Sequence, residues 1–172
     1  MTSKPAKLFA LALMAGILAI DQISKWAVVE NLQPETAYPV IGDIFRLYLV
    51  RNPGAAFSFG TSATIVFSFI QMAAVVVCIY LALRKTSTWA AWPIGLIGGG
   101  AAGNLTDRIF RSPGGLHGHV VDFFSFGSFA IFNVADAAIT VGVILYLIYA
   151  FFVEPRHRAR ATEEPEEVTV SE

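Results

Sequence analysis

The chain has 172 residues, of which 55% are hydrophobic and 15% are charged, and its formal net charge is -1. This balance is too apolar for a soluble domain of this length, so the sequence predicts an integral membrane protein. The near-zero net charge excludes a generally basic surface, and we expect no nucleic-acid partner.

Four apolar stretches are long enough to cross about 30 Å of hydrocarbon as helices of roughly 20 residues each. They cover residues 8–29, 63–83, 89–104 and 129–153. The third stretch is short for a full crossing. Lys4 and Lys7 precede the first stretch, as in a signal peptide. Because its apolar run continues past the small residues at 10–12 and further spans follow, we interpret it as a retained first span.

Basic residues beside the spans indicate their orientation. If both termini are cytoplasmic, that side carries Lys4, Lys7, Arg84, Lys85, Arg156, Arg158 and Arg160. The opposite side then carries Arg46, Arg51, Arg108 and Arg111. We therefore expect cytoplasmic termini, a single membrane-embedded domain over residues 1–160 and a disordered acidic tail at 161–172. The long segments 30–62 and 105–128 then lie on the outer side, where chemistry is expected.

Three further patterns predict local structure. The stretch "DIFRLYLVRN" at 43–52 predicts a strand or short hairpin against the membrane surface, and "NPGAAFSFG" at 52–60 predicts a turn. Gly95, Gly99 and Gly103 recur at every fourth position, which lets another helix approach closely. This ridge could pack internally or between copies of the chain, and we expect a monomer.

Polar residues of three spans lie, with this topology, near the same outer leaflet. Their spacing groups them on helix faces as Asp21 with Lys25, Asn104 with Asp107 and Arg108, and Asn133 with Asp136. Each of these helices therefore presents one polar stripe.

Asp122 and Asp136 stand among phenylalanines, valines and alanines, where an ionised carboxylate is costly to bury. A chain reversal around residues 125–128 could bring the two side chains together. Two neighbouring carboxylates share a proton, so one can take a proton from water while the other polarises a carbonyl. The pair therefore predicts amide hydrolysis without a covalent intermediate.

Five stretches carry a resemblance to a known family. They are "DQISK" at 21–25, "RNPGAAFSF" at 51–59, "GGAAGNLTDR" at 99–108, "VVDFF" at 120–124 and "FNVADAAI" at 132–139. In this order and spacing the chain resembles the lipoprotein signal peptidases (signal peptidase II) of bacteria. The resemblance implies an all-α integral membrane protein of four transmembrane helices. A small extracytoplasmic β-rich cradle and a flexible helix over the site are implied with them.

The same resemblance implies an aspartic endopeptidase of the bacterial cytoplasmic (inner) membrane, with its active site near the outer leaflet. Its substrates would be diacylglyceryl prolipoproteins in the membrane lipid, cut just before the lipid-modified cysteine. Asp122 and Asp136 would be the catalytic pair. The implied substrate-site residues are Asn52, Gly54, Asn104, Arg108, Asn133 and Ala135. Pro53 departs from the family pattern and stiffens the backbone there.

Simpler interpretations stand beside these roles. An ion pair between Asp21 and Lys25 explains both residues at least as well as catalysis does, so we place them with Asp107 in a supporting group. Asn104 and Asn133 could bridge helices, as amides do in membranes.

Metal binding, proton-coupled transport and a purely structural role are the alternatives to metal-free hydrolysis. His117 and His119 have no third ligand nearby, which is weak evidence for metal binding, so we expect no metal and no cofactor. A proton-coupled small membrane transporter would use intramembrane aspartates, but the acidic residues gather near one face and no inverted repeat is present. A structural adaptor would not explain why polar residues converge from three spans.

Overall fold

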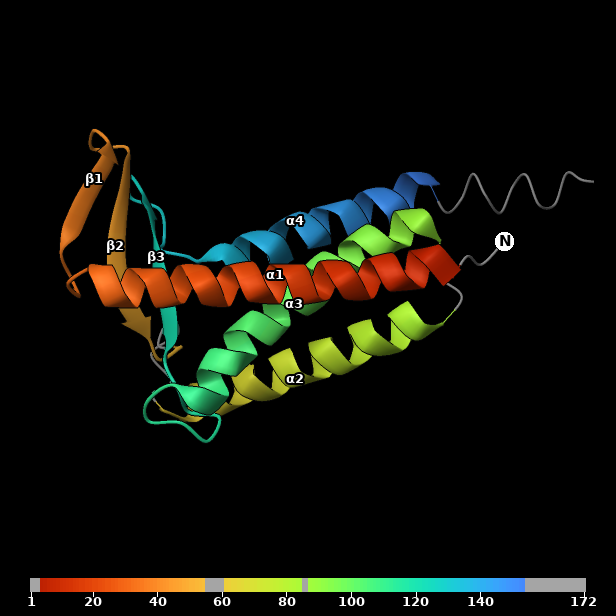
Figure 1. The fold of residues 1–172 in the computed structure, drawn as a ribbon, viewed down its shortest axis with the longest axis horizontal. Coiled ribbons are helices and arrows are strands. Elements are labelled where there is room, and N and C mark those ends of the chain that lie inside the picture. The colour runs from red at the N-terminus through yellow and green to blue at the C-terminus, as the bar shows by residue number, and fades with distance from the viewer. Residues whose placement is uncertain (1–3, 55–60, 85–86, 154–172) are drawn as a thin grey trace, which may run out of the picture.

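Four helices and a small sheet make up the fold (Figure 1). The computed structural model describes residues 4–54, 61–84 and 87–153. The helices are α1 (Lys4–Asn31), α2 (Thr61–Leu83), α3 (Thr88–Phe110) and α4 (Val134–Ile148), the last followed by a π-helical turn at Tyr149–Val153. The strands are β1 (Ala37–Ile41), β2 (Phe45–Asn52) and β3 (Val120–Phe126). The sheet lies at one end of the bundle, and α1 begins at the other.

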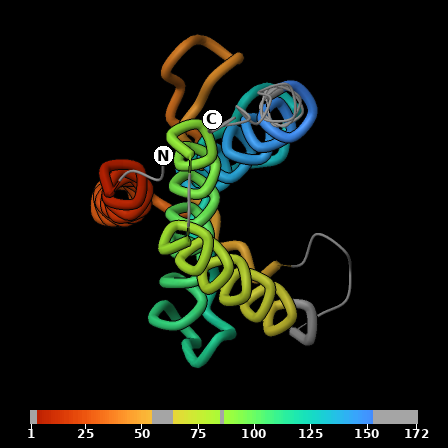
Figure 2. The backbone as a smooth tube through the Cα atoms, turned by 90° about the vertical axis from the view of Figure 1, so that its right-hand side faces the viewer, coloured from red at the N-terminus to blue at the C-terminus, as the bar shows by residue number. Residues whose placement is uncertain are grey.

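Helix α3 lies at the centre of the bundle and packs against α1, α2 and α4 (Figure 2). The predicted glycine ridge explains its closeness to α1. A Cβ atom on Gly95 would stand 2.7 Å from Leu13, one on Gly99 would stand 2.7 Å from Ile17, and one on Gly103 would collide with Asp21. The ridge therefore packs internally, against α1.

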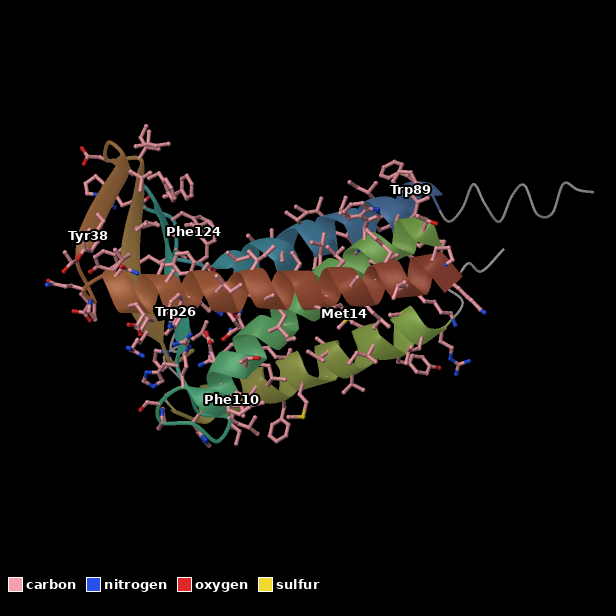
Figure 3. The ribbon with its side chains drawn as sticks, viewed as in Figure 1. Met14, Trp26, Tyr38, Trp89, Phe110 and Phe124 are labelled. Carbon is pink, nitrogen blue, oxygen red and sulfur yellow. The ribbon has the colours of Figure 1, made fainter. Side chains whose placement is uncertain are left out.

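Three helical segments are long and apolar enough to cross a membrane, judged by length and composition within the described residues. They are Lys4–Asn31, Thr64–Leu83 and Val134–Phe152. Trp26 and Trp89 lie at opposite ends of the bundle, and carbon atoms dominate the side chains between these ends (Figure 3). Tryptophan is typical of both membrane–water interfaces, so this arrangement fits a bundle that stands across a bilayer.

Two predicted helix boundaries are wrong. The helix expected at 89–104 continues to Phe110, because Asp107 and Arg108 find buried partners within the bundle. The helix expected at 129–153 begins only at Val134. The residues just before Val134 run back beside β3, where Phe132 and Phe124 exchange backbone hydrogen bonds.

The predicted strand or hairpin at 43–52 is confirmed, since β1 and β2 pair antiparallel around Gly42. Strand β3 is an element that the sequence patterns did not predict. It pairs antiparallel with β2 and makes the sheet order β1-β2-β3. Val121 and Phe123 on β3 pack with Leu49 on β2 and Val28 on α1. This apolar cluster fixes the sheet against the end of α1.

Three expectations fall wholly or partly outside the described residues. They concern the turn at 52–60, of which residues 55–60 are not described, the acidic tail at 161–172 and the end of the domain at residue 160. These expectations stay predictions.

Candidate active site

Asp122 sits in the middle of β3, with a side chain that is only 3% exposed. Its two carboxylate oxygens accept hydrogen bonds from two asparagine amides. Asn133 Nδ2 donates to Oδ1 over 2.6 Å, and Asn52 Nδ2 donates to Oδ2 over 2.9 Å. Asn52 belongs to the neighbouring strand β2, so sheet pairing holds this donor in place.

Asp136 lies in the first turn of α4, where Asn133 is the helix N-cap. Asn133 Oδ1 accepts from the backbone N–H of Asp136 over 2.9 Å, and Asp136 Oδ2 accepts from the backbone N–H of Asn133 over 3.2 Å. This reciprocal pair is a capping box. Asn104 Nδ2 of α3 donates to Asp136 Oδ1 over 2.8 Å. The positive end of the helix dipole also stabilises negative charge at this position.

Asn133 connects the two carboxylates. Its backbone N–H reaches Asp136, and its side-chain amide reaches Asp122. Burial raises the pKa of Asp122 to about 6, with Asp136 adding to the rise and the amides of Asn52 and Asn133 opposing it. The Asp136 carboxylate therefore lies close enough to Asp122 to act on it electrostatically.

A pocket of about 220 Å³ opens onto both carboxylates. Four of the six predicted substrate-site residues line it, namely Asn52, Gly54, Asn104 and Arg108. Asn133 and Ala135 are fully buried beside the pocket instead. Asn133 bridges the carboxylates, while Ala135 packs so close to Gly100 that a Cβ atom there would meet the Ala135 carbonyl.

Arg108 of α3 extends along the pocket wall and is 4% exposed. Its Nη1 donates to the carbonyl oxygen of Asn52 over 3.2 Å and to that of Gly118 over 3.0 Å. Gly54 adopts a positive φ of 87°, and a Cβ atom there would stand 3.2 Å from Arg108 Nη2. Glycine therefore allows the strand end and the guanidinium to approach each other.

A closed ionic cluster lies behind the pocket, on the α1 side of α3. Lys25 Nζ is 2.8 Å from Asp21 Oδ2, 2.8 Å from Asp107 Oδ2 and 2.8 Å from Asn104 Oδ1. The side chains of Lys25, Asp21 and Asp107 are all 0% exposed. Arg111 Nε lies 2.7 Å from Asp107 Oδ1, which brings the cluster to two positive and two negative charges.

This cluster also holds the backbone next to each pocket carboxylate. Asp107 Oδ2 accepts from the N–H of Val121 over 3.1 Å, one residue before Asp122. Asp21 Oδ1 accepts from the N–H of Ala135 over 3.0 Å, one residue before Asp136. Because Lys25 pairs with both carboxylates, one ammonium group links the two segments that carry Asp122 and Asp136.

Several residues at the site were not predicted. Gln22 donates through Nε2 to the Gly103 carbonyl and to both cluster carboxylates, and Arg111 pairs with Asp107. Phe67 and Gln71 of α2 line the pocket. Gln22 stands between Asp21 and Lys25 in the "DQISK" stretch, which could have indicated it. Gln71 is the one amide side chain in the largely apolar α2, which could have indicated it, whereas nothing in the sequence marks Phe67.

Over residues 4–54, 61–84 and 87–153, no group of three or more His, Cys, Asp or Glu side chains is placed to hold a metal ion. His117 Nδ1 lies 3.0 Å from the carbonyl oxygen of Gly115 in the loop before β3.

Comparisons with known proteins identify relatives of the chain. The family model described as "Signal peptidase (SPase) II" matches residues 13–152. A lipoprotein signal peptidase of Streptomyces coelicolor is 49% identical over 146 residues, covering 85% of this chain and 71% of the relative. One of Mycobacterium avium is 45% identical over 142 residues, covering 83% and 78%. A solved bacterial membrane enzyme shares the fold with a TM-score of 0.73 and 26% identity, over 84% of this chain and 93% of that one.

Proposed function

The chain belongs to the signal peptidase II family of aspartic peptidases and acts as a lipoprotein signal peptidase, and we propose that Asp122 and Asp136 are its catalytic pair. The observation that carries the proposal is the shared pocket, in which both carboxylates meet neutral amide donors. Amide donors orient a carboxylate without supplying the positive charge that would keep it permanently ionised.

The proposed reaction begins with one proton on the pair. Asp122, with its raised pKa, holds this proton, and Asp136 at the helix N-terminus is ionised. Asp136 takes a proton from a water molecule, whose oxygen bonds to the scissile carbonyl carbon, while Asp122 donates its proton to the carbonyl oxygen. Collapse of the tetrahedral intermediate breaks the C–N bond. Asp136 then gives its proton to the leaving nitrogen, and a hydroxyl of the intermediate returns one to Asp122.

The remaining site residues have positioning and binding roles in this proposal. Asn52, Asn104 and Asn133 fix the rotation of the two carboxylates through the hydrogen bonds described above. Asp21, Lys25 and Asp107 support the segments that carry them. Gly54 and Arg108 line the pocket and contact the substrate in this proposal. Ala135 instead allows α4 to pack closely against Gly100 of α3.

The proposed membrane placement makes α3 the fourth crossing. Its 23 residues extend roughly 35 Å at about 1.5 Å per residue, which is long enough to cross the hydrocarbon core. It packs against all three of the apolar helices α1, α2 and α4. The described chain starts and ends at the bundle end opposite the sheet, which supports two cytoplasmic termini and a catalytic pair near the outer leaflet (Figure 1). The chain works as a monomer in this proposal, since the glycine ridge is used internally.

The proposed substrate is a diacylglyceryl prolipoprotein, cut before its lipid-modified cysteine. Each CH₂ group of an acyl chain transferred from water contributes about 0.8 kcal/mol, which keeps the cysteine at membrane depth. The lipid therefore delivers the scissile bond to a pair that is itself close to the membrane.

The test gives purified protein two peptides of identical sequence, one diacylglyceryl-modified and one unlipidated. We expect cleavage of the lipidated form before the cysteine and little or none of the other, with the products identified by mass. Asp136→Asn is the inactive control. Equal cleavage of both peptides, or cleavage elsewhere in the signal segment, would contradict the proposed specificity.

A further inference from the structure

Two buried polar atoms of pocket-lining residues have no hydrogen-bond partner among the described residues. One is Nε of Arg108 on α3, and the other is Oε1 of Gln71 on α2. Both residues line the pocket that holds Asp122 and Asp136. Buried polar groups are nearly always paired in native proteins, so an unpaired donor and an unpaired acceptor beside one pocket require an explanation.

The two atoms are complementary to a peptide backbone. Arg108 Nε carries an N–H that can donate to a carbonyl oxygen, and Gln71 Oε1 can accept from a backbone N–H. An extended peptide presents both groups, and its main-chain hydrogen bonds contribute affinity without depending on side-chain identity. The terminal torsion of glutamine is broad, so a small rotation can turn its amide toward a ligand in the pocket.

Gln71 is suitably placed for this role because it faces the catalytic pair from another helix. Asn104, Arg108 and Asp136 come from α3 and α4, whereas Gln71 and Phe67, one helical turn apart, come from α2. A substrate chain in the pocket therefore has α2 on one side. The Oε1 atom of Gln71 has no partner within the described part of the chain, in contrast to Arg108 Nη1, which already donates to the carbonyls of Asn52 and Gly118.

We propose that Gln71 is a substrate-binding residue, whose side-chain carbonyl accepts a hydrogen bond from a backbone N–H of the precursor near the scissile bond. Arg108 Nε donates to a neighbouring backbone carbonyl of the same segment. This inference rests on the proposed function of the pocket. It adds a contact from α2 that recognises the main chain, so precursors with different side chains before the cysteine can be held in the same register.

The test is a double-mutant cycle between Gln71 and the substrate backbone. Wild type and Gln71→Met are compared on a diacylglyceryl peptide and on three analogues, each with one backbone N–H replaced by an ester oxygen at one of the three residues before the cysteine. Gln33→Met is the matched control, because Gln33 is an exposed glutamine outside the pocket. Thermal unfolding checks that each variant is folded.

We expect Gln71→Met to raise KM for the parent peptide roughly three- to tenfold with little change in kcat. For one ester analogue, the KM of the wild type should be raised by a similar factor. On that same analogue, Gln71→Met should have no higher KM than the wild type. Gln33→Met should behave as wild type. If Gln71→Met does not fold, Gln71→Ala replaces it in the same cycle.

The outcomes separate the two proposals. Failure of the wild type to cut the parent peptide would contradict the proposed function. Normal cleavage by the wild type together with an unchanged KM in the Gln71 variants would overturn the inference. If Gln71→Met raises KM by the same factor on the parent peptide and on every ester analogue, the inference is also overturned. No single backbone N–H among the three would then be the partner of Gln71.

Discussion

Two pairs of aspartates lie at the sheet end of the bundle, and their partners differ. Asp21 and Asp107 share the ammonium group of Lys25, with 2.8 Å to each, and Arg111 adds a second cation. Asp122 and Asp136 accept from asparagine amides, and no ion pair within 4 Å joins either to a Lys or Arg over residues 4–54, 61–84 and 87–153.

The difference explains how one membrane protein uses the same residue type for two purposes. A cation beside a buried carboxylate keeps it ionised, which suits a fixed structural link. Neutral donors orient two neighbouring carboxylates without placing a cation in direct contact with either, which suits a pair that keeps a proton it can exchange. We therefore propose that the cation-paired cluster positions the backbone and that the amide-bound pair carries out the hydrolysis.

The largest expected effect comes from removing the exchangeable proton. Asp122→Asn and Asp136→Asn each keep the shape of the side chain but lose acid–base chemistry, so kcat/KM for a diacylglyceryl precursor should fall roughly 10²- to 10⁴-fold. The melting temperature of both variants should remain close to that of the wild type. Wild-type cleavage by either variant would remove the distinction between the two pairs.

Replacing Lys25 tests the other pair. Lys25→Met leaves Asp21 and Asp107 buried without their shared cation, which should destabilise the fold by about 3–5 kcal/mol. Thermal unfolding in detergent measures this effect.

A compensated variant provides the control for Lys25. Combining Lys25→Met with Asp21→Asn removes the uncompensated charge and leaves Asp107 paired with Arg111, so it should recover much of the lost stability. If Lys25→Met alone has the same melting temperature as the wild type, the cluster does not have the positioning role assigned to it.

A smaller effect is expected from the contact between the glycine ridge and the cluster. Gly103→Ala places a Cβ atom against the Asp21 carboxylate, so α1 and α3 must separate, at a cost of about 1–3 kcal/mol. Gly16→Ala is the matched control on α1, because no atom lies within 4 Å of a Cβ added there. Similar melting temperatures for the two variants would show that close packing at Gly103 is dispensable.

The sequence predicted much of the fold because hydrophobic length and short-range spacing determine it. Four helices, the hairpin at 43–52 and the tight packing along Gly95, Gly99 and Gly103 all follow from local patterns. Strand β3 did not, because "VVDFFSF" shows no regular alternation of apolar and polar residues and resembles the start of a span. Its pairing with β2 depends on a contact about 70 residues away in the chain.

The site was predictable to the extent that its residues lie in the five recognised stretches. Those stretches placed Asp122, Asp136 and the asparagines together, and the structure also brings them together. Local spacing could not reveal that Ala135 faces Asp21, or that Gln71 lines the pocket, because both facts depend on how helices pack. Helix packing is decided by the whole bundle and not by one segment.

We expect a proton on Asp122 under mildly acidic conditions, where exposed carboxylic acids, with pKa values near 4, are ionised. Its folded-state pKa of about 6 lies above the ordinary value of 3.8. The folded protein therefore binds this proton more tightly than the unfolded chain, and the contribution of Asp122 to stability declines as pH rises from about 4 to about 6. Activity that needs the proton on Asp122 should also decline as pH rises through about 6.

Infrared titration of purified protein with isotope-labelled aspartate tests this claim most directly, since a protonated carboxyl group has its own C=O stretching band. We expect the wild type to show one such band with a midpoint near pH 6, absent from Asp122→Asn and retained in Gln33→Met. A wild type without this band, or an Asp122→Asn variant that keeps it, would contradict the assignment of a shared proton to the amide-bound pair.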